Sequence, residues 1–262
     1  MDNTSEHARI IPAEFDDGWV LEIDGEIQSH VDPNRPNVLR FEYLRRIGNL
    51  LDVSWPPTQP IRILHLGAGA LTLVRYVQAT RPGSNQTVIE LESDLVDLVT
   101  EKLPLPNGTE LKVITGDARA ELQRSSEGDF DAIVVDIFTG HDTATHLTDR
   151  TFYADALHHL AEQGLLLVNI GDDEGLGFFV QQADVLQSVA RDAGQAGVWA
   201  LSDASTLNER RAGNIVVAAS ANFPTDHDDV TALRSRLSAA GPHPASVLVP
   251  SDTASLIHTL RG

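Results

Sequence analysis

The sequence predicts an α/β fold: a mostly parallel, seven-stranded sheet covered by helices on both faces, plus a small N-terminal β-hairpin region. From residue 61 onward, short apolar runs alternate with segments of helix length, which is typical of parallel strands buried on both faces. Before that point, an Asp-Gly pair separates two strand-like segments, as in a tight hairpin turn. We expect two units, residues 1–52 and 53–262, divided near the prolines that end a helical pattern.

The N-terminal region is predicted to hold a hairpin and one helix. The hairpin is the stretch WVLEIDGEIQ, which turns at its Asp-Gly pair. After a loop rich in proline and asparagine, apolar residues such as Leu39, Tyr43 and Ile47 recur at helical spacing. The prolines of SWPPTQP end that helix.

Seven apolar runs in the rest of the chain are predicted strands. They are RILHLGA, TVIEL, LKVITGD, FDAIVVDIF, GLLLVNIG, VWALSD and NIVVAAS. Segments such as LTLVRYVQAT and SDLVDLVTEKL have the length and spacing of the intervening helices, and DDVTALRSRLSAAG predicts a further helix after the last strand.

Composition and charge limit the classes of partner. The 262 residues are 42% hydrophobic and 22% charged, and they include no cysteine, which excludes disulfides. The first residues, MDNTSEHARI, have neither the basic nor the apolar region of a signal peptide, and no apolar run in the sequence approaches the length of a membrane span. We therefore expect a cytoplasmic protein without a membrane partner. The net charge of −19 disfavours nucleic acid and would attract a cationic small molecule, although acidic side chains that only maintain solubility give the same balance.

The ends of the first four predicted strands carry residues suited to binding a ligand, which in open α/β sheets sits at the carboxyl ends of the strands. Gly67 and Gly69 follow the first strand and allow a sharp turn close to a ligand. Glu90 ends the second strand, and its two oxygens could accept both hydroxyls of a ribose. Asp117 follows the third strand, where it either caps the next helix or accepts from an adenine amine. Asp136 ends the fourth strand, where partial burial would raise its pKa.

These stretches resemble the spermidine synthase family, the polyamine aminopropyltransferases, which share the Rossmann-like methyltransferase fold. WVLEIDGEIQ resembles the family's hairpin, FEY its helix tyrosine, and LGAGALTLVR its glycine-rich loop. VIELESDLV and TGDAR are similar to the ribose-binding and adenine-binding stretches. FDAIVVD and HLTDRTFY, the most specific of these blocks, resemble the strand with the catalytic aspartate and the segment after it.

The resemblance implies a role for each matching position. Asp136 is the expected catalytic base, and Tyr43, Thr139 and Asn169 are the expected contacts of an amine substrate. The residues expected to bind the adenosyl co-substrate are Gln28, Gly67, Gly69, Glu90, Glu92, Asp117 and Ala118.

The departures from the family pattern concern the amine-binding positions. Ala70 stands where the family has an aspartate for the aminopropyl end, and Thr139 stands where it has a second amine-binding aspartate. A desolvated, unpaired ammonium is costly, so either other acids such as Asp142, Asp172 or Asp173 compensate or the ligand differs.

Three hypotheses follow. The first is aminopropyl transfer from decarboxylated S-adenosylmethionine to an amine acceptor, in polyamine biosynthesis. The second is a methyltransferase that uses S-adenosylmethionine itself, because Ala70 would not repel the methionine carboxylate. The third is a non-catalytic relative that binds a nucleoside. We expect no metal site, interpret His65 as a core or boundary histidine, and, by the resemblance, expect a homodimer.

Overall fold

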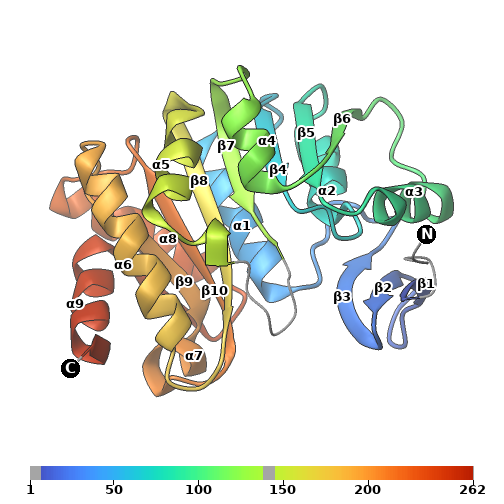
Figure 1. Cartoon of the computed structure of the whole chain (residues 1–262). Helices are drawn as coiled ribbons and strands as arrows, with labels where there is room; N and C mark the ends of the chain where they lie inside the picture. Colours follow the sequence, from blue (N-terminus) through green and yellow to red (C-terminus); the bar gives the residue numbers. More distant parts are fainter. Residues whose placement is uncertain (1–6, 138–144, 262) are drawn as a thin grey trace.

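A large eight-stranded sheet forms the centre of the molecule, which the computed structural model describes over residues 7–137 and 145–261 (Figure 1). In chain order, its strands are β4 (Arg62–Leu66), β5 (Asn85–Glu90), β6 (Glu110–Thr115), β7 (Phe130–Val135), β8 (Leu160–Asp172), β9 (Trp199–Asp203), β10 (Gly213–Ser220) and β11 (Ala245–Leu248). They lie side by side in the order β11-β9-β10-β8-β7-β4-β5-β6.

The sheet is mostly parallel, as predicted, but it has one strand more than the predicted seven. The five neighbouring strands β8, β7, β4, β5 and β6 pair in parallel, whereas β10 runs antiparallel to both β8 and β9. The additional strand is β11, which pairs antiparallel with β9 at the sheet edge. It has only four residues, of which Val247 alone is buried, so it gives little of the apolar signal by which the other strands were predicted.

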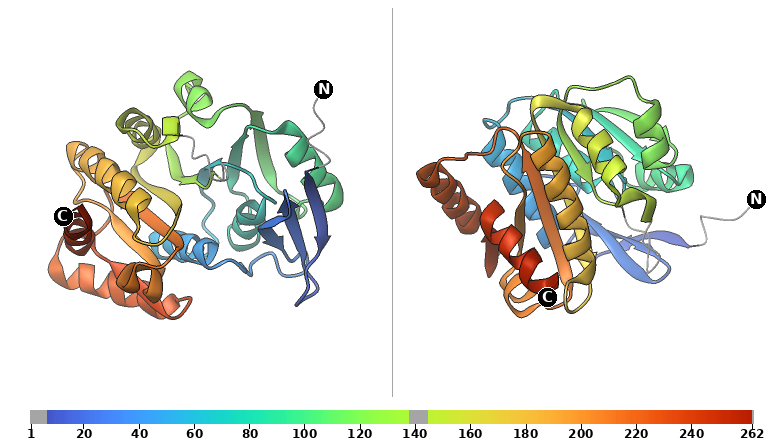
Figure 2. Two further views of the ribbon diagram at one scale, coloured as in Figure 1. Left: turned by 60° about the horizontal axis from the view of Figure 1, so that its bottom comes forward. Right: turned by 60° about the vertical axis from the view of Figure 1, so that its left-hand side comes forward.

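Helices cover both faces of the sheet, as Figure 2 shows. In the part of the chain described, they are α1 (Glu42–Ser54), α2 (Thr72–Thr80), α3 (Ser93–Lys102), α4 (Ala118–Arg124), α5 (Arg150–His158), α6 (Gly177–Asp192), α7 (Ala204–Glu209), α8 (His227–Ala240) and α9 (Pro250–Arg261), with a 3-10 turn at Thr145–Leu147. One core cluster joins one face of the sheet to α4, α5, α6 and α9, and another joins the opposite face to α1, α2 and α8. None of the helices among these residues is long and apolar enough to cross a membrane.

A separate three-stranded antiparallel sheet lies beside α3 (Figures 1 and 2). Its strands are β1 (Ala8–Pro12), β2 (Trp19–Ile23) and β3 (Glu26–Val31). The predicted hairpin is confirmed as β2 and β3, and both Asp24 (φ 51°) and Gly25 (φ 85°) adopt the positive φ that its tight turn requires. Helix α1, which the prediction assigned to the N-terminal unit, packs in the core of the large sheet. The division of the chain at residue 52 stays a prediction.

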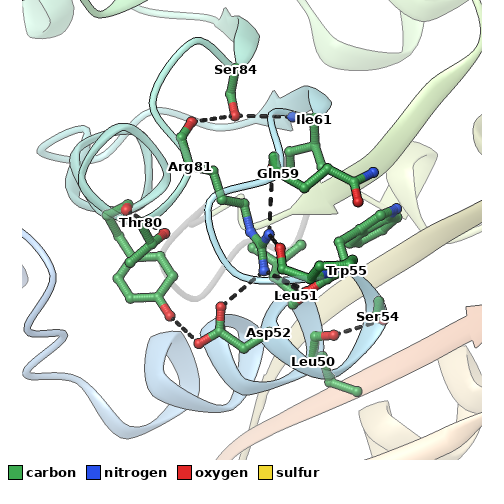
Figure 3. A network of polar contacts seen from close by, with 12 residues as sticks. Leu50, Leu51, Asp52, Ser54, Trp55, Gln59, Ile61, Thr80, Arg81 and Ser84 are labelled. Carbon is green, nitrogen blue, oxygen red and sulfur yellow. Dashed lines mark hydrogen bonds and ion pairs between the residues drawn. The ribbon is translucent and has the colours of Figure 1, made fainter.

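A fully buried arginine fixes the end of α1 against the large sheet (Figure 3). The guanidinium of Arg81 donates to the Asp52 carboxylate at 3.1 Å and to the carbonyl oxygens of Leu51 and Pro56 at 3.1 and 2.8 Å. The other Asp52 oxygen accepts from the Tyr76 hydroxyl at 2.7 Å. The network thus supplies a charged donor to carbonyl oxygens in the last turn of α1 and in the loop that follows it. It thereby holds the C-terminal end of α1 beside the segments that lead into β4 and β5.

Candidate functional site

The turn after β4 brings the backbone against two other segments. Gly67 has φ 97°, and a β-carbon there would lie 2.2 Å from the carbonyl oxygen of Asp136. Gly69 has φ 48°, and a β-carbon there would lie 2.7 Å from the hydroxyl oxygen of Ser29. Only glycine meets both requirements without strain. The turn is therefore in close contact with the ends of β7 and β3.

The carboxylate of Glu90 ties this turn to the end of β5. One oxygen accepts the amide of Ala68 at 2.8 Å, and the other accepts the amide of Glu92 at 3.1 Å. Each carboxylate oxygen has a second lone pair, which leaves Glu90 able to accept from a ligand hydroxyl as well. Glu92 itself is exposed and begins the approach to α3.

Asp117 caps α4, as one of its two predicted roles requires. One carboxylate oxygen accepts the amide of Ala120 at 2.9 Å, and the other lies 2.7 Å from the ring nitrogen Nε2 of His146. Burial acts to raise the pKa of Asp117, but the hydrogen bonds from His146 and Ala120 outweigh it, so the pKa is lowered. Ala118, the first residue of α4, is buried beside it.

Asp136 follows β7 and lies between two polar side chains from other elements. The side-chain amide nitrogen of Asn169 on β8 donates to the Asp136 carboxylate at 2.9 Å, and the hydroxyl of Tyr43 on α1 lies beside the same carboxylate. Burial raises the pKa of Asp136, and the hydrogen bonds from Asn169 and Tyr43 only partly offset this. Burial and the Asp136 charge also raise the pKa of Tyr43, so its hydroxyl stays protonated.

The small sheet closes one side of the site through β3. The hydroxyl oxygen of Ser29 accepts the amide of Ala70 at 3.2 Å, and the Thr72 hydroxyl donates to the carbonyl oxygen of His30 at 3.0 Å. These two bonds dock β3 on the glycine turn and on the first residue of α2. Gln28, one residue before Ser29, is half-buried at this junction.

The glycine turn, the ends of these strands, β3 and α1 together line one cleft of about 1380 Å³ at the carboxyl ends of the parallel strands. Thr139 lies outside the described residues, and so does Asp142. The predicted site residues that the structure describes all contribute to the wall: Gln28, Tyr43, Gly67, Gly69, Glu90, Glu92, Asp117, Ala118, Asp136 and Asn169.

The cleft also contains polar residues that the sequence analysis missed. His65 lies in its floor, and Glu42, Arg46 and Asp203 lie toward the end formed by α1 and β9. Asp203 ends β9 and has the same sequence signal as Glu90, an acid after an apolar run, which could have identified it. The other three follow from tertiary packing alone.

Two of the acids considered as alternative amine partners, Asp172 and Asp173, do not line the cleft. The carboxylate of Asp172 accepts the amide of Phe179 at 2.6 Å and the amide of Asp173 at 2.8 Å, so it organises the start of α6. Asp173 is exposed outside the cleft. An acid near a strand end has a structural use here that leaves it far less available to a ligand.

Comparisons with known sequences point to one class of enzyme. No family model matches the chain. The chain is 25% identical to the polyamine aminopropyltransferase of Neisseria meningitidis serogroup A over 144 residues, which are 55% of this chain and 54% of that protein. It is 25% identical to the polyamine aminopropyltransferase of Chromobacterium violaceum over 191 residues, which are 70% of this chain and 72% of that protein. The match thus spans about half the length of the Neisseria relative.

Solved structures support the same relationship and the fold. A probable spermidine synthase from Corynebacterium glutamicum has a TM-score of 0.80 and 28% identity, covering 95% of this chain and 90% of that one. A spermidine synthase in complex with the transition state analogue AdoDATO has a TM-score of 0.64 and 14% identity, covering 99% of this chain and 88% of that one. Human methyltransferase-like protein 13 has a TM-score of 0.53 and 14% identity, covering 76% of this chain and 88% of that one. The last two likenesses concern the fold alone, and they confirm the predicted Rossmann-like methyltransferase fold.

Proposed function

We propose that the chain belongs to the spermidine synthase family and that it transfers an aminopropyl group from decarboxylated S-adenosylmethionine to an amine acceptor. The observation that carries this proposal is the position of Asp136. Its carboxylate lies in the middle of a single cleft, between Glu90 and Asp117 on one side and Tyr43 and Asn169 on the other. A base between two binding regions is the arrangement that a two-substrate transfer requires.

The residues around the glycine turn fit an adenosyl group. Gly67 lets the turn lie directly against the backbone of Asp136, and Glu90 keeps lone pairs free for ribose hydroxyls. Asp117 and Ala118 lie at the next strand end, where an adenine ring would follow the ribose. We propose that these residues, together with Gln28, Gly69 and Glu92, hold the donor.

The chemistry asks for alignment and for one proton acceptor. The bound donor supplies a sulfonium carbon, so attack by an amine nitrogen forms a C–N bond as the C–S bond breaks and its electron pair stays on sulfur. Asp136 would take the proton that the attacking nitrogen loses, and its raised pKa makes it a stronger base than an ordinary carboxylate. Asn169 holds one Asp136 oxygen, which fixes the direction of the other lone pairs.

The far end of the cleft suits a cationic acceptor. Glu42 is exposed there and pairs with the buried Arg46 at 3.3 Å. Asp203 is partly exposed and lines the cleft, and one of its oxygens, Oδ1, caps α7. We propose that Glu42 and Asp203 pair with the distal ammonium of the acceptor, while Tyr43 and Asn169 contact the reacting end. The overall charge of −19 favours the approach of such a cation.

The test is release of 5′-methylthioadenosine from decarboxylated S-adenosylmethionine when putrescine, cadaverine or spermidine is added. Liquid chromatography should show release that depends on the amine, with a product heavier than the amine by one aminopropyl group. Asp136→Asn should reduce turnover by at least about a hundredfold. Asp173→Asn, which changes an acid outside the cleft, is the matched control and should leave turnover unchanged. Failure of every amine to support release would overturn the proposal.

The sequence relatives reported above are polyamine aminopropyltransferases, which favours this reaction over the methyl transfer kept as an alternative. Formation of S-adenosylhomocysteine from S-adenosylmethionine would restore that alternative. The homodimer and the cytoplasmic location stay predictions, and the molecular mass in solution tests the first of them.

A further inference from the structure

His65 occupies the floor of the cleft in a position that its sequence context does not reveal. It lies on β4, where it pairs with Val88 on β5 and with Val134 on β7. Glu90 and Asp136 each come two residues after those partners, on the same face of the sheet, because side chains alternate along a strand. The imidazole therefore lies one step below the gap between Glu90 and Asp136.

The hydrogen bonds around His65 determine which ring nitrogen carries the proton. The amide nitrogen of Gln86 donates to the carbonyl oxygen of Val74 at 3.1 Å, so its amide oxygen is the atom that faces Nε2 of His65, also at 3.1 Å. Nε2 is therefore the donor, and Nδ1 keeps a lone pair. Among the described residues Nδ1 has no hydrogen-bond partner, and His65 is one of the residues that line the cleft, although it is only 4% exposed.

The imidazole is also uncharged at neutral pH. Burial lowers the pKa of His65 to about 4, since a charged ring at the centre of the sheet would be poorly solvated. A neutral ring with a free lone pair is an acceptor that attracts an ammonium group rather than repelling it.

The strand order places His65 on the donor side of Asp136. Across the sheet, Asn169 lies on β8, Asp136 follows β7, His65 lies on β4 and Glu90 ends β5. A donor whose nucleoside binds at Glu90 and whose reacting carbon lies near Asp136 would pass its aminopropyl chain over β4. Ala70 offers that chain no acceptor, because it is 1% exposed and packs in the apolar core under the small sheet.

We propose that Nδ1 of His65 accepts a hydrogen bond from the terminal ammonium of the donor's aminopropyl group. The inference rests on the proposed function and names the group that recognises the donor's cation. A neutral histidine takes the place of a carboxylate partner, and the nearby Asp136 carboxylate supplies the negative charge.

Two substitutions separate this role from a structural one. In His65→Gln, the amide reaches the former Nε2 position and keeps a partner for Gln86, but no acceptor remains at the Nδ1 position. In His65→Asn, the amide oxygen lies at about the Nδ1 position, while the bond to Gln86 is lost. A purely structural role for His65 predicts that the first variant binds ligands better than the second. Recognition of the ammonium predicts the opposite order.

The measurement is calorimetric binding of decarboxylated S-adenosylmethionine and of 5′-methylthioadenosine, which lacks the ammonium. His65→Gln should weaken the first ligand at least about tenfold and the second less than about twofold, since a hydrogen bond to a charged group is lost. His65→Asn should stay within about threefold of the unaltered chain for both.

The possible outcomes distinguish this inference from the proposed function. Equal affinity of His65→Gln and the unaltered chain for decarboxylated S-adenosylmethionine overturns the role of His65 alone. Equal weakening of both ligands by His65→Gln also overturns it, because the effect is then on the fold of the site. An unaltered chain that does not bind decarboxylated S-adenosylmethionine overturns the proposed function and this inference together.

Discussion

The carbonyl oxygen of Asp136 lies so close to Gly67 that a β-carbon at position 67 would stand 2.2 Å from it. Both partners belong to the backbone, so neither can rotate away as a side chain would. The contact joins the turn after β4 to the segment after β7, and it sets the distance between the glycine turn and the Asp136 carboxylate. The geometry of the candidate site therefore depends on the absence of a side chain at one position.

Gly67→Ala is expected to lower the free energy of unfolding by about 3 kcal/mol, because it adds a clash to an unfavourable φ. Gly175→Ala is the matched control. Gly175 has almost the same φ, 94° against 97°, but a β-carbon there would meet no atom within 4 Å. The control should lose only about 1 kcal/mol. Urea unfolding of both variants measures the difference, and equal losses would show that the contact with Asp136 carries no cost.

Asp136→Asn is expected to stabilise the fold at neutral pH while it abolishes turnover. Because burial raises the pKa of Asp136 above 3.8, the native state binds the proton more tightly than the unfolded chain does. The carboxyl thus favours folding fully below its unfolded pKa and loses this contribution as the pH rises through the native pKa. The uncharged amide of asparagine avoids the cost of burying a charged carboxylate at neutral pH. Urea unfolding should show a gain at neutral pH that disappears below pH 3.8, and a less stable variant at neutral pH would contradict this account.

Two substitutions of Asp117 separate its role in the helix from its proposed role toward a nucleoside. Asp117→Ser keeps a side-chain oxygen that can cap α4, whereas Asp117→Ala removes the cap. Only the alanine variant should lose stability, by about 1 kcal/mol. Both variants should weaken 5′-methylthioadenosine, as measured by calorimetry. Full affinity in the serine variant would restrict Asp117 to the cap.

Arg81→Met is expected to lower the free energy of unfolding by about 3 kcal/mol, because several carbonyl groups of the network in Figure 3 lose a buried charged donor. Arg124→Met is the matched control, since Arg124 is 73% exposed and pairs with Glu121 on one helix. Its loss should stay below about 0.5 kcal/mol. Thermal unfolding compares the two, and a similar shift in both melting temperatures would contradict the structural role of Arg81.

The fold was largely predictable because most strands are buried on both faces. On β7, Ile133 and Val135 pack in one core cluster and Ala132 and Val134 in the other, so the stretch from Ala132 to Val135 is entirely apolar. Element ends were less predictable. The helical pattern of α5 continues in the sequence past His158, but the chain there joins β8, which begins at Leu160 and pairs with Phe130.

The acids of the candidate site were predictable because parallel strands bring their carboxyl ends to one edge. Their partners were not. The bond from Asn169 to Asp136 depends on the neighbouring strand, and that from His146 to Asp117 on a distant turn. His65 sits in an apolar run and looks like a core residue until the strand register places it under the cleft.

The docking of β3 on the glycine turn has an energetic consequence for the small sheet. Ser29 contacts the turn that the adenosyl group of a ligand would contact from the other side, and His30 contacts the first residue of α2 just after it. If docking of β3 strengthens ligand binding by a given free energy, ligand binding must stabilise the docked position of β3 by the same free energy. Substitutions in β1 or β2 that loosen the sheet would thus alter ligand affinity without touching the ligand, and occupancy of the cleft would slow amide hydrogen exchange along β3.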